Sequence, residues 1–175
     1  MHDNPILPLV RNPYKLLNAA GLEKGQKVVE VGCGPGFFTI PAAKIVGEKG
    51  HVYAVDIHPR AVARVKEKVE KEALRNVTAI CGNASNTGLT GASVDLAFLF
   101  GLHYITGGLE KVISELYRVL RPGRILSFEK VRGSEKDLVE EVERGGFIYT
   151  EKRGRIYLFK RVEDRTVKRN ARTSG

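Results

Sequence analysis

A glycine-rich loop is the feature that most constrains this chain. An apolar run over residues 28–31 passes through Glu30 into Gly32, Gly34 and Gly36, with one residue between successive glycines. Glycine adopts turns that other residues avoid, and it lets the backbone approach a ligand closely. A helical pattern over Phe37–Val46 follows the loop. A strand, a glycine loop and a helix in this order are typical of the first unit of a parallel α/β sheet with a ligand at its carboxyl edge.

The rest of the chain alternates in the same way. Five β-rich runs are separated by segments with apolar residues at steps of three and four, which predict helices. The predicted strands are Lys27–Val31, His51–Val55, Val77–Cys81, Val94–Leu99 and Arg124–Glu129. The further predicted helices are Pro59–Leu74, Leu109–Leu120 and Asp137–Arg144. Such alternation predicts βαβ units with helices on both faces of a mostly parallel sheet.

Two further β-rich runs end the pattern. Phe147–Glu151 and Arg155–Arg161 are separated by only a few residues, and so short a connection permits only an antiparallel hairpin. The expected fold class is therefore α/β: a Rossmann-like, mostly parallel seven-stranded sheet with helices on both faces and a C-terminal antiparallel hairpin.

The length of 175 residues favours one domain with one core. We expect this domain over residues 27–162. Residues 1–26 would form an N-terminal segment with one short helix, Pro13–Ala20. Residues 163–175 would form a basic, disordered tail.

Composition excludes several classes of protein. No apolar run is long enough to span a membrane, and the first residues do not resemble a signal peptide. Cys33 and Cys81 are not in a metal-binding spacing, so we expect no metal site. Two thiols in a chain without a signal peptide favour a reducing, cytoplasmic location.

Two acidic residues indicate the kind of ligand. Asp56 lies 20 residues after Gly36, where a carboxylate suits hydrogen bonds to ribose hydroxyls. Glu30 lies two residues before the loop, where it would repel the pyrophosphate of a dinucleotide such as NAD but complement a cation. The glycine spacing also departs from that of dinucleotide sites, because Phe37 stands where their third glycine would be. The sequence therefore favours a nucleoside ligand with positive charge.

These residues carry a family resemblance. Glu30-x-Gly32-x-Gly34-x-Gly36 resembles motif I of the class I S-adenosylmethionine (SAM)-dependent methyltransferases, and the resemblance continues in order over about Lys24 to Arg161. Asp56 is similar to the acid that holds the ribose, and Ile57 to the apolar residue beside the adenine. The resemblance implies a sheet of seven strands with the last one antiparallel.

Later segments extend the resemblance. Gly82-Asn83-Ala84 resembles the loop after the third strand, with Asn83 in place of the usual acid. Its amide oxygen could still accept from the adenine amino group. Leu120-Arg121-Pro122-Gly123-Arg124 is similar to a turn in small-molecule methyltransferases such as the ubiquinone/menaquinone C-methyltransferases. The resemblance implies SAM as cofactor and S-adenosylhomocysteine as product. The implied cofactor contacts are Glu30, Gly32, Gly34, Gly36, Asp56, Ile57, Asn83, Ala84 and Phe100.

Catalysis in this family needs mainly alignment of the acceptor with the methyl group. A general base is required only where the acceptor must lose a proton. His103 follows the fourth predicted strand and is the candidate base. A structural histidine that caps the following helix is the favoured alternative.

The acceptor is not identified by the sequence. The leading interpretation is a small molecule. The runner-up is an RNA or protein acceptor that docks on the basic end, since residues 152–175 carry nine Lys or Arg against two acids. A third interpretation, from another class, is a SAM-binding protein without catalysis. A membrane partner is not expected, and a homo-oligomer stays open.

Overall fold

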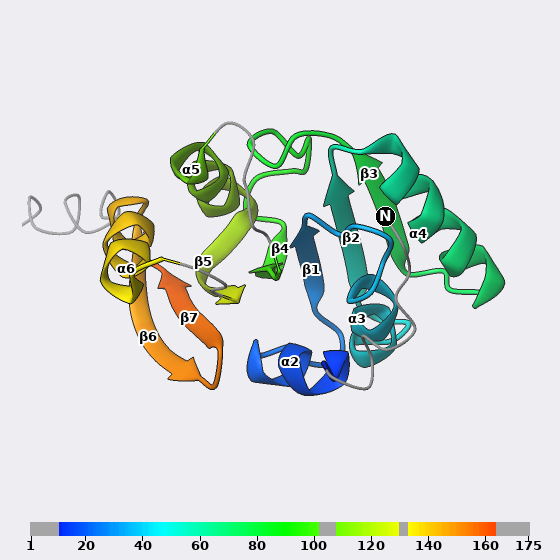
Figure 1. Ribbon diagram of the computed structural model, residues 1–175, viewed down its shortest axis with the longest axis horizontal. Helices are drawn as coiled ribbons and strands as arrows, with labels where there is room; N and C mark the ends of the chain where they lie inside the picture. Colours follow the sequence, from blue (N-terminus) through cyan, green and yellow to red (C-terminus); the bar gives the residue numbers. More distant parts are fainter. Residues whose placement is uncertain (1–10, 102–107, 130–132, 164–175) are drawn as a thin grey trace, which may run out of the picture.

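A seven-stranded sheet runs through the molecule in the order β3-β2-β1-β4-β5-β7-β6 (Figure 1). The computed structural model describes residues 11–101, 108–129 and 133–163. The strands are β1 (Lys27–Val31), β2 (His51–Asp56), β3 (Val77–Cys81), β4 (Val94–Leu99), β5 (Leu120–Glu129), β6 (Phe147–Arg153) and β7 (Ile156–Arg161). Strands β1 to β5 pair in parallel. Strand β7 pairs antiparallel with both β5 and β6, so the expected fold class is confirmed.

Helices cover both faces of the sheet. Apolar side chains of α2 (Pro13–Ala19), α3 (Thr39–Val46) and α4 (Pro59–Lys71) pack on one face. Those of α5 (Leu109–Val119) and α6 (Glu135–Arg144) pack on the other. None of the helices in the described ranges has the length and apolar character needed to cross a membrane.

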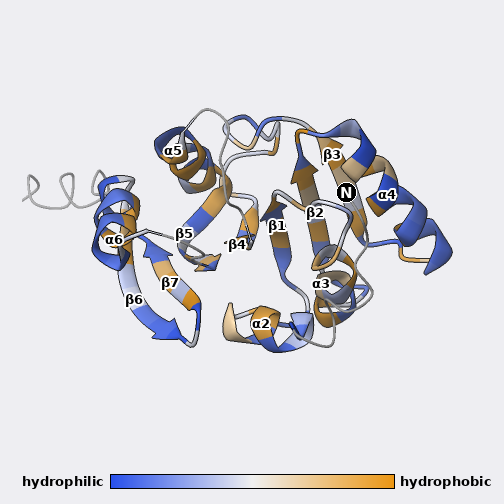
Figure 2. Ribbon diagram, viewed as in Figure 1, coloured by the Kyte–Doolittle hydropathy of each residue, from blue (hydrophilic) through white to orange (hydrophobic). Residues whose placement is uncertain are grey.

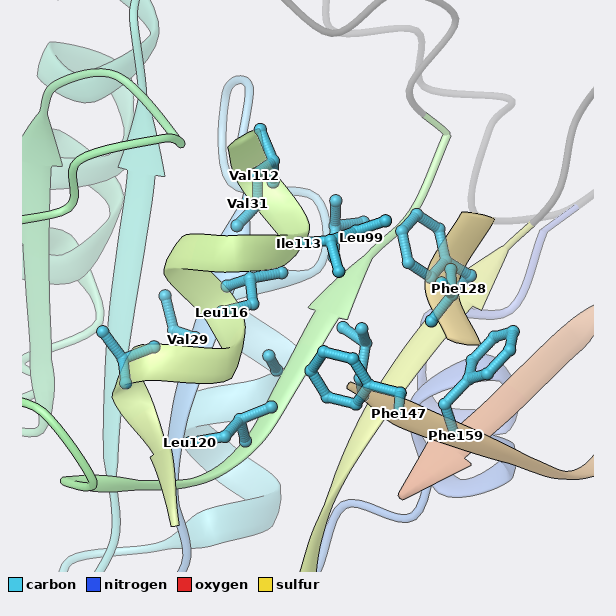
Figure 3. Packing of buried hydrophobic residues seen from close by; sticks show 14 of the residues in the cluster. Val29, Val31, Leu99, Val112, Ile113, Leu116, Leu120, Phe128, Phe147 and Phe159 are labelled. Carbon is cyan, nitrogen blue, oxygen red and sulfur yellow. The ribbon is translucent and has the colours of Figure 1, made fainter. Parts of the chain in front are cut away.

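The larger hydrophobic cluster lies between the sheet and the helices α5 and α6 (Figure 3). Leu116 and Ile113 of α5 are fully buried against Val29 of β1 and Leu99 of β4. Phe147 and Phe159 extend the cluster onto the terminal hairpin. Figure 2 shows the matching pattern, with hydrophobic residues on the strands and hydrophilic residues along β6 and the outer side of α4. Each Å² of buried apolar surface contributes about 25 cal/mol to the stability of the folded state. Such clusters are therefore the main stabilising contribution to the fold.

Strand β5 begins earlier than predicted. Leu120 ends the helical pattern, yet it is fully buried and already pairs with Val94 of β4. The register then shifts, so that Leu96 pairs with Ile125 and the intervening residues form an irregularity. Gly123 has a φ of +74° there. A bulge tolerates a proline that a regular ladder would exclude, and Pro122 and Gly123 therefore lie inside the strand.

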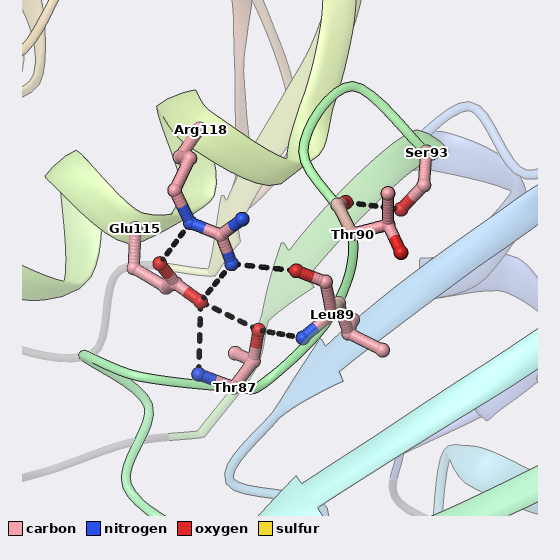
Figure 4. Close-up of polar contacts among 6 residues, drawn as sticks. All are labelled: Thr87, Leu89, Thr90, Ser93, Glu115 and Arg118. Carbon is pink, nitrogen blue, oxygen red and sulfur yellow. Dashed lines mark hydrogen bonds and ion pairs between the residues drawn. The ribbon is translucent and has the colours of Figure 1, made fainter.

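Figure 4 shows how α5 holds the loop after β3. The Thr87 amide and hydroxyl donate to Glu115 Oε1 over 2.8 and 2.6 Å. Arg118 donates to both Glu115 oxygens and, over 2.7 Å, to the Leu89 carbonyl. Burial alone would raise the pKa of Glu115, but the hydrogen bonds from Arg118 and Thr87 outweigh burial and lower the pKa. The network fixes the loop that leaves the carboxyl end of β3.

We predict that Glu115→Gln lowers the free energy of unfolding by about 1–2 kcal/mol at pH 7, because charge-assisted bonds become neutral ones. A lowered folded-state pKa gives stability that is present above the unfolded pKa and is lost as pH falls through the folded pKa. The difference between wild type and variant, measured by urea unfolding, should therefore shrink toward pH 3. Glu67→Gln, in an exposed pair with Arg64, is the control and should change little. A pH-independent difference would contradict the prediction.

Candidate functional site

The glycine-rich loop turns sharply at the carboxyl end of β1. Gly32, Gly34 and Gly36 have φ values of +73°, +51° and +88°. The amides of Gly32 and Cys33 both donate to the Val55 carbonyl of β2, over 2.8 and 3.1 Å. A Cβ on Gly36 would lie 3.3 Å from Val65 of α4, in a backbone conformation that L side chains rarely adopt. Glycine is therefore required here, as the spacing predicted.

Glu30 lies at the end of β1 and is buried, with 2% of its surface exposed. Thr39 of α3 donates from its hydroxyl to Glu30 Oε2 over 2.5 Å. Burial raises the pKa of Glu30 to about 8, against the hydrogen bond from Thr39 and with a contribution from the negative charge of Asp56. Glu30 therefore does not face solvent. A buried carboxyl group of this kind favours a nearby cation and opposes a nearby phosphate.

Asp56 ends β2 beside the glycine loop. Its Oδ2 accepts from the Gly34 amide and its Oδ1 from the His58 amide, each over 2.9 Å. The side chain is largely buried. A carboxylate has about four acceptor positions, so two amide bonds leave capacity for hydroxyl donors. Asp56 thus links the glycine loop to the start of α4.

The segment after β3 lies next to the end of β2. The Gly82 amide donates to the Asp56 carbonyl over 3.0 Å, and the Cys81 thiol donates to the Ile57 carbonyl over 3.8 Å. Ile57 is 44% exposed, which suits an apolar contact with a planar ring. Ala84 packs against the larger hydrophobic cluster.

Asn83 is already engaged within this loop. Its Oδ1 accepts from the amide and the hydroxyl of Ser85, both over 2.9 Å. An amide oxygen has two acceptor positions. The oxygen therefore has little capacity left for an adenine amino group, and the Nδ2 donors are the atoms better suited to a ligand.

Phe100 directly follows β4. Phe100 is 5% exposed and lies between the rings of Phe98 and Phe38, with centroids at 5.0 and 5.1 Å. It is a core residue at the edge of the site. His103, the candidate base, lies outside the described residues.

Cys33 of the glycine loop is buried. Burial, followed by the nearby charges of Glu30 and Asp56, raises its pKa, so the thiol stays protonated and is a poor nucleophile. Among the residues that the structure describes, no group of three His, Cys, Asp or Glu side chains is placed to hold a metal ion.

Two contacts at this edge of the sheet were not predicted. Thr39, the partner of Glu30, lies in a helix whose sequence gives no sign of the contact. Glu129, at the carboxyl end of β5, is buried and forms an ion pair with Arg11. Its signal was present in the sequence, because an acid that ends an apolar strand is the same pattern as Glu30 and Asp56.

Together these residues form an acidic edge beside a glycine turn. Glu30 and Asp56 supply carboxyl groups, and Ile57 supplies an apolar surface. This set of groups fits a ribonucleoside with a cationic group and does not fit a pyrophosphate.

We predict that Glu30 makes stability fall as pH rises. A folded pKa raised above the unfolded value gives stability that is fully present below about pH 4.5 and is lost as pH rises through 8. Unfolding of Glu30→Gln, which cannot ionise, should lack this loss, so the variant should gain about 2–5 kcal/mol on the wild type between pH 5 and 9. Urea unfolding at both pH values measures this, with Glu67→Gln as control. Parallel pH profiles for wild type and Glu30→Gln would contradict it.

Comparison with known proteins identifies the family of this chain. Residues 28–123, more than half of the chain, match the methyltransferase domain family. The probable cobalt-precorrin-6B C(15)-methyltransferase (decarboxylating) of Sulfolobus acidocaldarius is 34% identical over 128 residues, which are 71% of this chain and 65% of that protein. The demethylmenaquinone methyltransferase of Geobacillus sp. (strain WCH70) is 35% identical over 103 residues, 58% of this chain and 44% of that protein. The chain thus spans less than two thirds of the length of these relatives.

Solved structures share the fold. A SAM dependent methyltransferase from Aquifex aeolicus has a TM-score of 0.78 at 29% identity, covering 90% of this chain and 92% of that one. The cyclase SpnF has a TM-score of 0.71 at 19% identity, covering 81% and 58%, and shows the fold alone. The family match includes the glycine loop, Asp56 and the loop after β3. The chain therefore belongs to the methyltransferase domain family, with the class I, SAM-dependent fold that its motifs indicated.

Proposed function

We propose that this protein transfers a methyl group from SAM to a small-molecule acceptor. The observation that carries the proposal is the buried Glu30 directly before a left-handed glycine turn, with Asp56 on the neighbouring strand. SAM is a nucleoside with cationic sulfonium and amino groups and no phosphate, so it matches both carboxyl groups. NAD would place a pyrophosphate against Glu30.

In this proposal the strand order sets the orientation of the cofactor. Asn83 and Ile57 bind the adenine, Asp56 the ribose, and the glycine loop the methionyl part. Ala84 and Phe100 support the two ends of the site from the core. SAM supplies an activated methyl group, and the residues of this chain align the acceptor and exclude water.

The bond changes balance without a further reagent. A lone pair of the acceptor forms the bond to the methyl carbon, and the sulfur–methyl bond breaks with its electrons on sulfur. S-adenosylhomocysteine leaves, and any acceptor proton passes to a base or to water. His103 stays the candidate for that base.

The relatives do not fix the acceptor. Their names include a precorrin, a demethylmenaquinone and an arsenite methyltransferase, which favour a small molecule. They also include a protein-L-isoaspartate O-methyltransferase. A cytoplasmic location is part of the proposal and is supported by two free cysteines.

Cofactor binding should depend on Asp56. We predict that calorimetry detects S-adenosylhomocysteine in the micromolar range and no NAD. Asp56→Ala should weaken S-adenosylhomocysteine by ~1.5–3 kcal/mol, because a charge-assisted acceptor is lost. Asp56→Asn keeps one acceptor for the loop amides and serves as the matched control for loop structure, and Asn83→Ala should cost less than Asp56→Ala. Tighter binding of NAD than of S-adenosylhomocysteine would exclude the proposal.

Methyl transfer itself is tested with methyl-labelled SAM and a metabolite extract. We expect a labelled small molecule, identified by mass, that still forms when residues 165–175 are deleted. Label that enters only RNA or protein, and disappears with the deletion, would support the runner-up. Binding without any transfer would support a non-catalytic SAM-binding protein. In the same assay, His103→Ala should lower kcat at least about tenfold if His103 is the base.

A further inference from the structure

A buried charged pair lies at the carboxyl edge of the sheet and has no role in the proposed cofactor contacts. Glu129 ends β5, and its side chain is 1% exposed. Arg11 lies directly before α2, and its guanidinium forms an ion pair with Glu129. In the strand order, β5 is two strands away from β1, on the side opposite to β2 and β3. The pair therefore lies on the far side of the glycine loop from the adenosine-binding residues.

Arg11 is held from several sides. Its guanidinium carbon lies 4.9 Å from the centre of the Phe38 ring, next to the glycine loop. Its Nη1 lies 3.1 Å from the position that a Cβ on Gly101 would take, just after β4. Guanidinium groups stack on aromatic rings and keep their donors in a fixed plane. Arg11 thus connects the loop after β1 with the ends of β4 and β5.

This guanidinium has donor capacity to spare. Its Nη2 forms the ion pair with Glu129, but among the residues that the structure describes neither Nη2 nor the buried Nε has a hydrogen-bond partner. A buried donor without a partner costs free energy that a ligand oxygen would recover.

A second basic residue, Arg155, lies near Arg11. Glu129 pairs with Ile156 across the β5–β7 ladder, and Arg155 directly precedes Ile156 in the chain. Burial, and then the charge of Arg155, lowers the pKa of Arg11. The positive charge of Arg155 therefore adds to that of Arg11, and this charge favours an anion.

Stability alone does not account for the pair. The N-terminal helix is already attached to the sheet by Leu17 in the core and by the Ser127 hydroxyl, which donates to the Ala20 carbonyl over 2.7 Å. A buried ion pair adds little stability over apolar residues of the same size. Removing the two charged groups from water costs free energy, and this cost points to a role of the pair in recognition.

We propose that Arg11 binds a carboxylate at the carboxyl ends of β4 and β5, and that Glu129 positions its guanidinium. The inference rests on the proposed function and assigns a further binding residue to the same site. The carboxylate has two sources, the methionyl end of SAM or an acidic group on the acceptor. Either source would give the Arg11 guanidinium an oxygen to which it can donate.

The first arm of the test compares two ligands by calorimetry. S-adenosylhomocysteine carries the methionyl carboxylate, and 5′-methylthioadenosine lacks it. If the carboxylate belongs to the cofactor, Arg11→Gln should weaken S-adenosylhomocysteine at least about tenfold and leave 5′-methylthioadenosine within about twofold. Glu129→Gln should move the same ratio in the same direction, a readout that a general loss of stability would not produce.

The second arm titrates benzoate and its neutral analogue benzamide into protein saturated with S-adenosylhomocysteine. If the carboxylate belongs to the acceptor, Arg11→Gln should bind S-adenosylhomocysteine normally and weaken benzoate at least about fivefold, with benzamide unaffected. Benzoate is also titrated without S-adenosylhomocysteine. This titration tests Arg11 even if the wild type binds no cofactor. Failure of the wild type to bind the cofactor would contradict the proposed function separately.

Matched variants keep the test decisive. Arg11→Lys should restore part of the effect, because it keeps the charge but not the planar donors. The double variant Arg11→Gln/Glu129→Gln leaves no unpaired buried charge and serves if a single variant fails to fold. Arg153→Gln removes a guanidinium that donates to the Ala19 carbonyl of the same segment and should change neither arm. Unchanged ligand ratios and unchanged benzoate binding in Arg11→Gln would overturn the proposal.

Discussion

The parallel pairing of β1 between β2 and β4 is the constraint on which the rest of the structure depends. Val31 of β1 is in register with Val55 and with Leu99, so the three strands end together. The glycine loop is then held against β2, because the amides of Gly32 and Cys33 share the Val55 carbonyl. Since parallel strands present all their carboxyl ends at one edge, residues far apart in the chain meet there.

Burying carboxyl groups at this edge opposes folding. Asp56 and Glu129 end strands, Glu30 is the last residue but one of its strand, and all three are buried, so each needs a polar partner in place of water. Thr39 and two backbone amides donate to Glu30 and Asp56, and Arg11 supplies the opposite charge to Glu129. The apolar clusters on the two faces provide the stability that makes such a polar edge tolerable, as is common at functional sites.

Much of the fold could be predicted because local sequence patterns determine the strands and helices. Strands β1, β3 and β4 have the predicted bounds, since short apolar runs between turn residues leave little choice. The start of β5 could not be predicted, because Leu120 continues the helical spacing of α5 and joins the sheet only through its pairing with Val94. The contact between Arg11 and Glu129 is likewise invisible in the sequence, since 118 residues separate them and no periodicity links them.

The sequence by itself determined the fold class, the glycine turn and the acids beside it. These depend on properties of single residues and on spacing: left-handed backbone at glycine, period-two and helical patterns, and charge at strand ends. Only the tertiary structure decided how these groups are engaged. In the folded chain the Asn83 side-chain oxygen accepts from Ser85, burial raises the pKa of Glu30, and Arg11 lies at the ends of β4 and β5. Hydrogen-bond capacity, desolvation and charge pairing depend on which groups meet in space, and chain order alone does not contain that information.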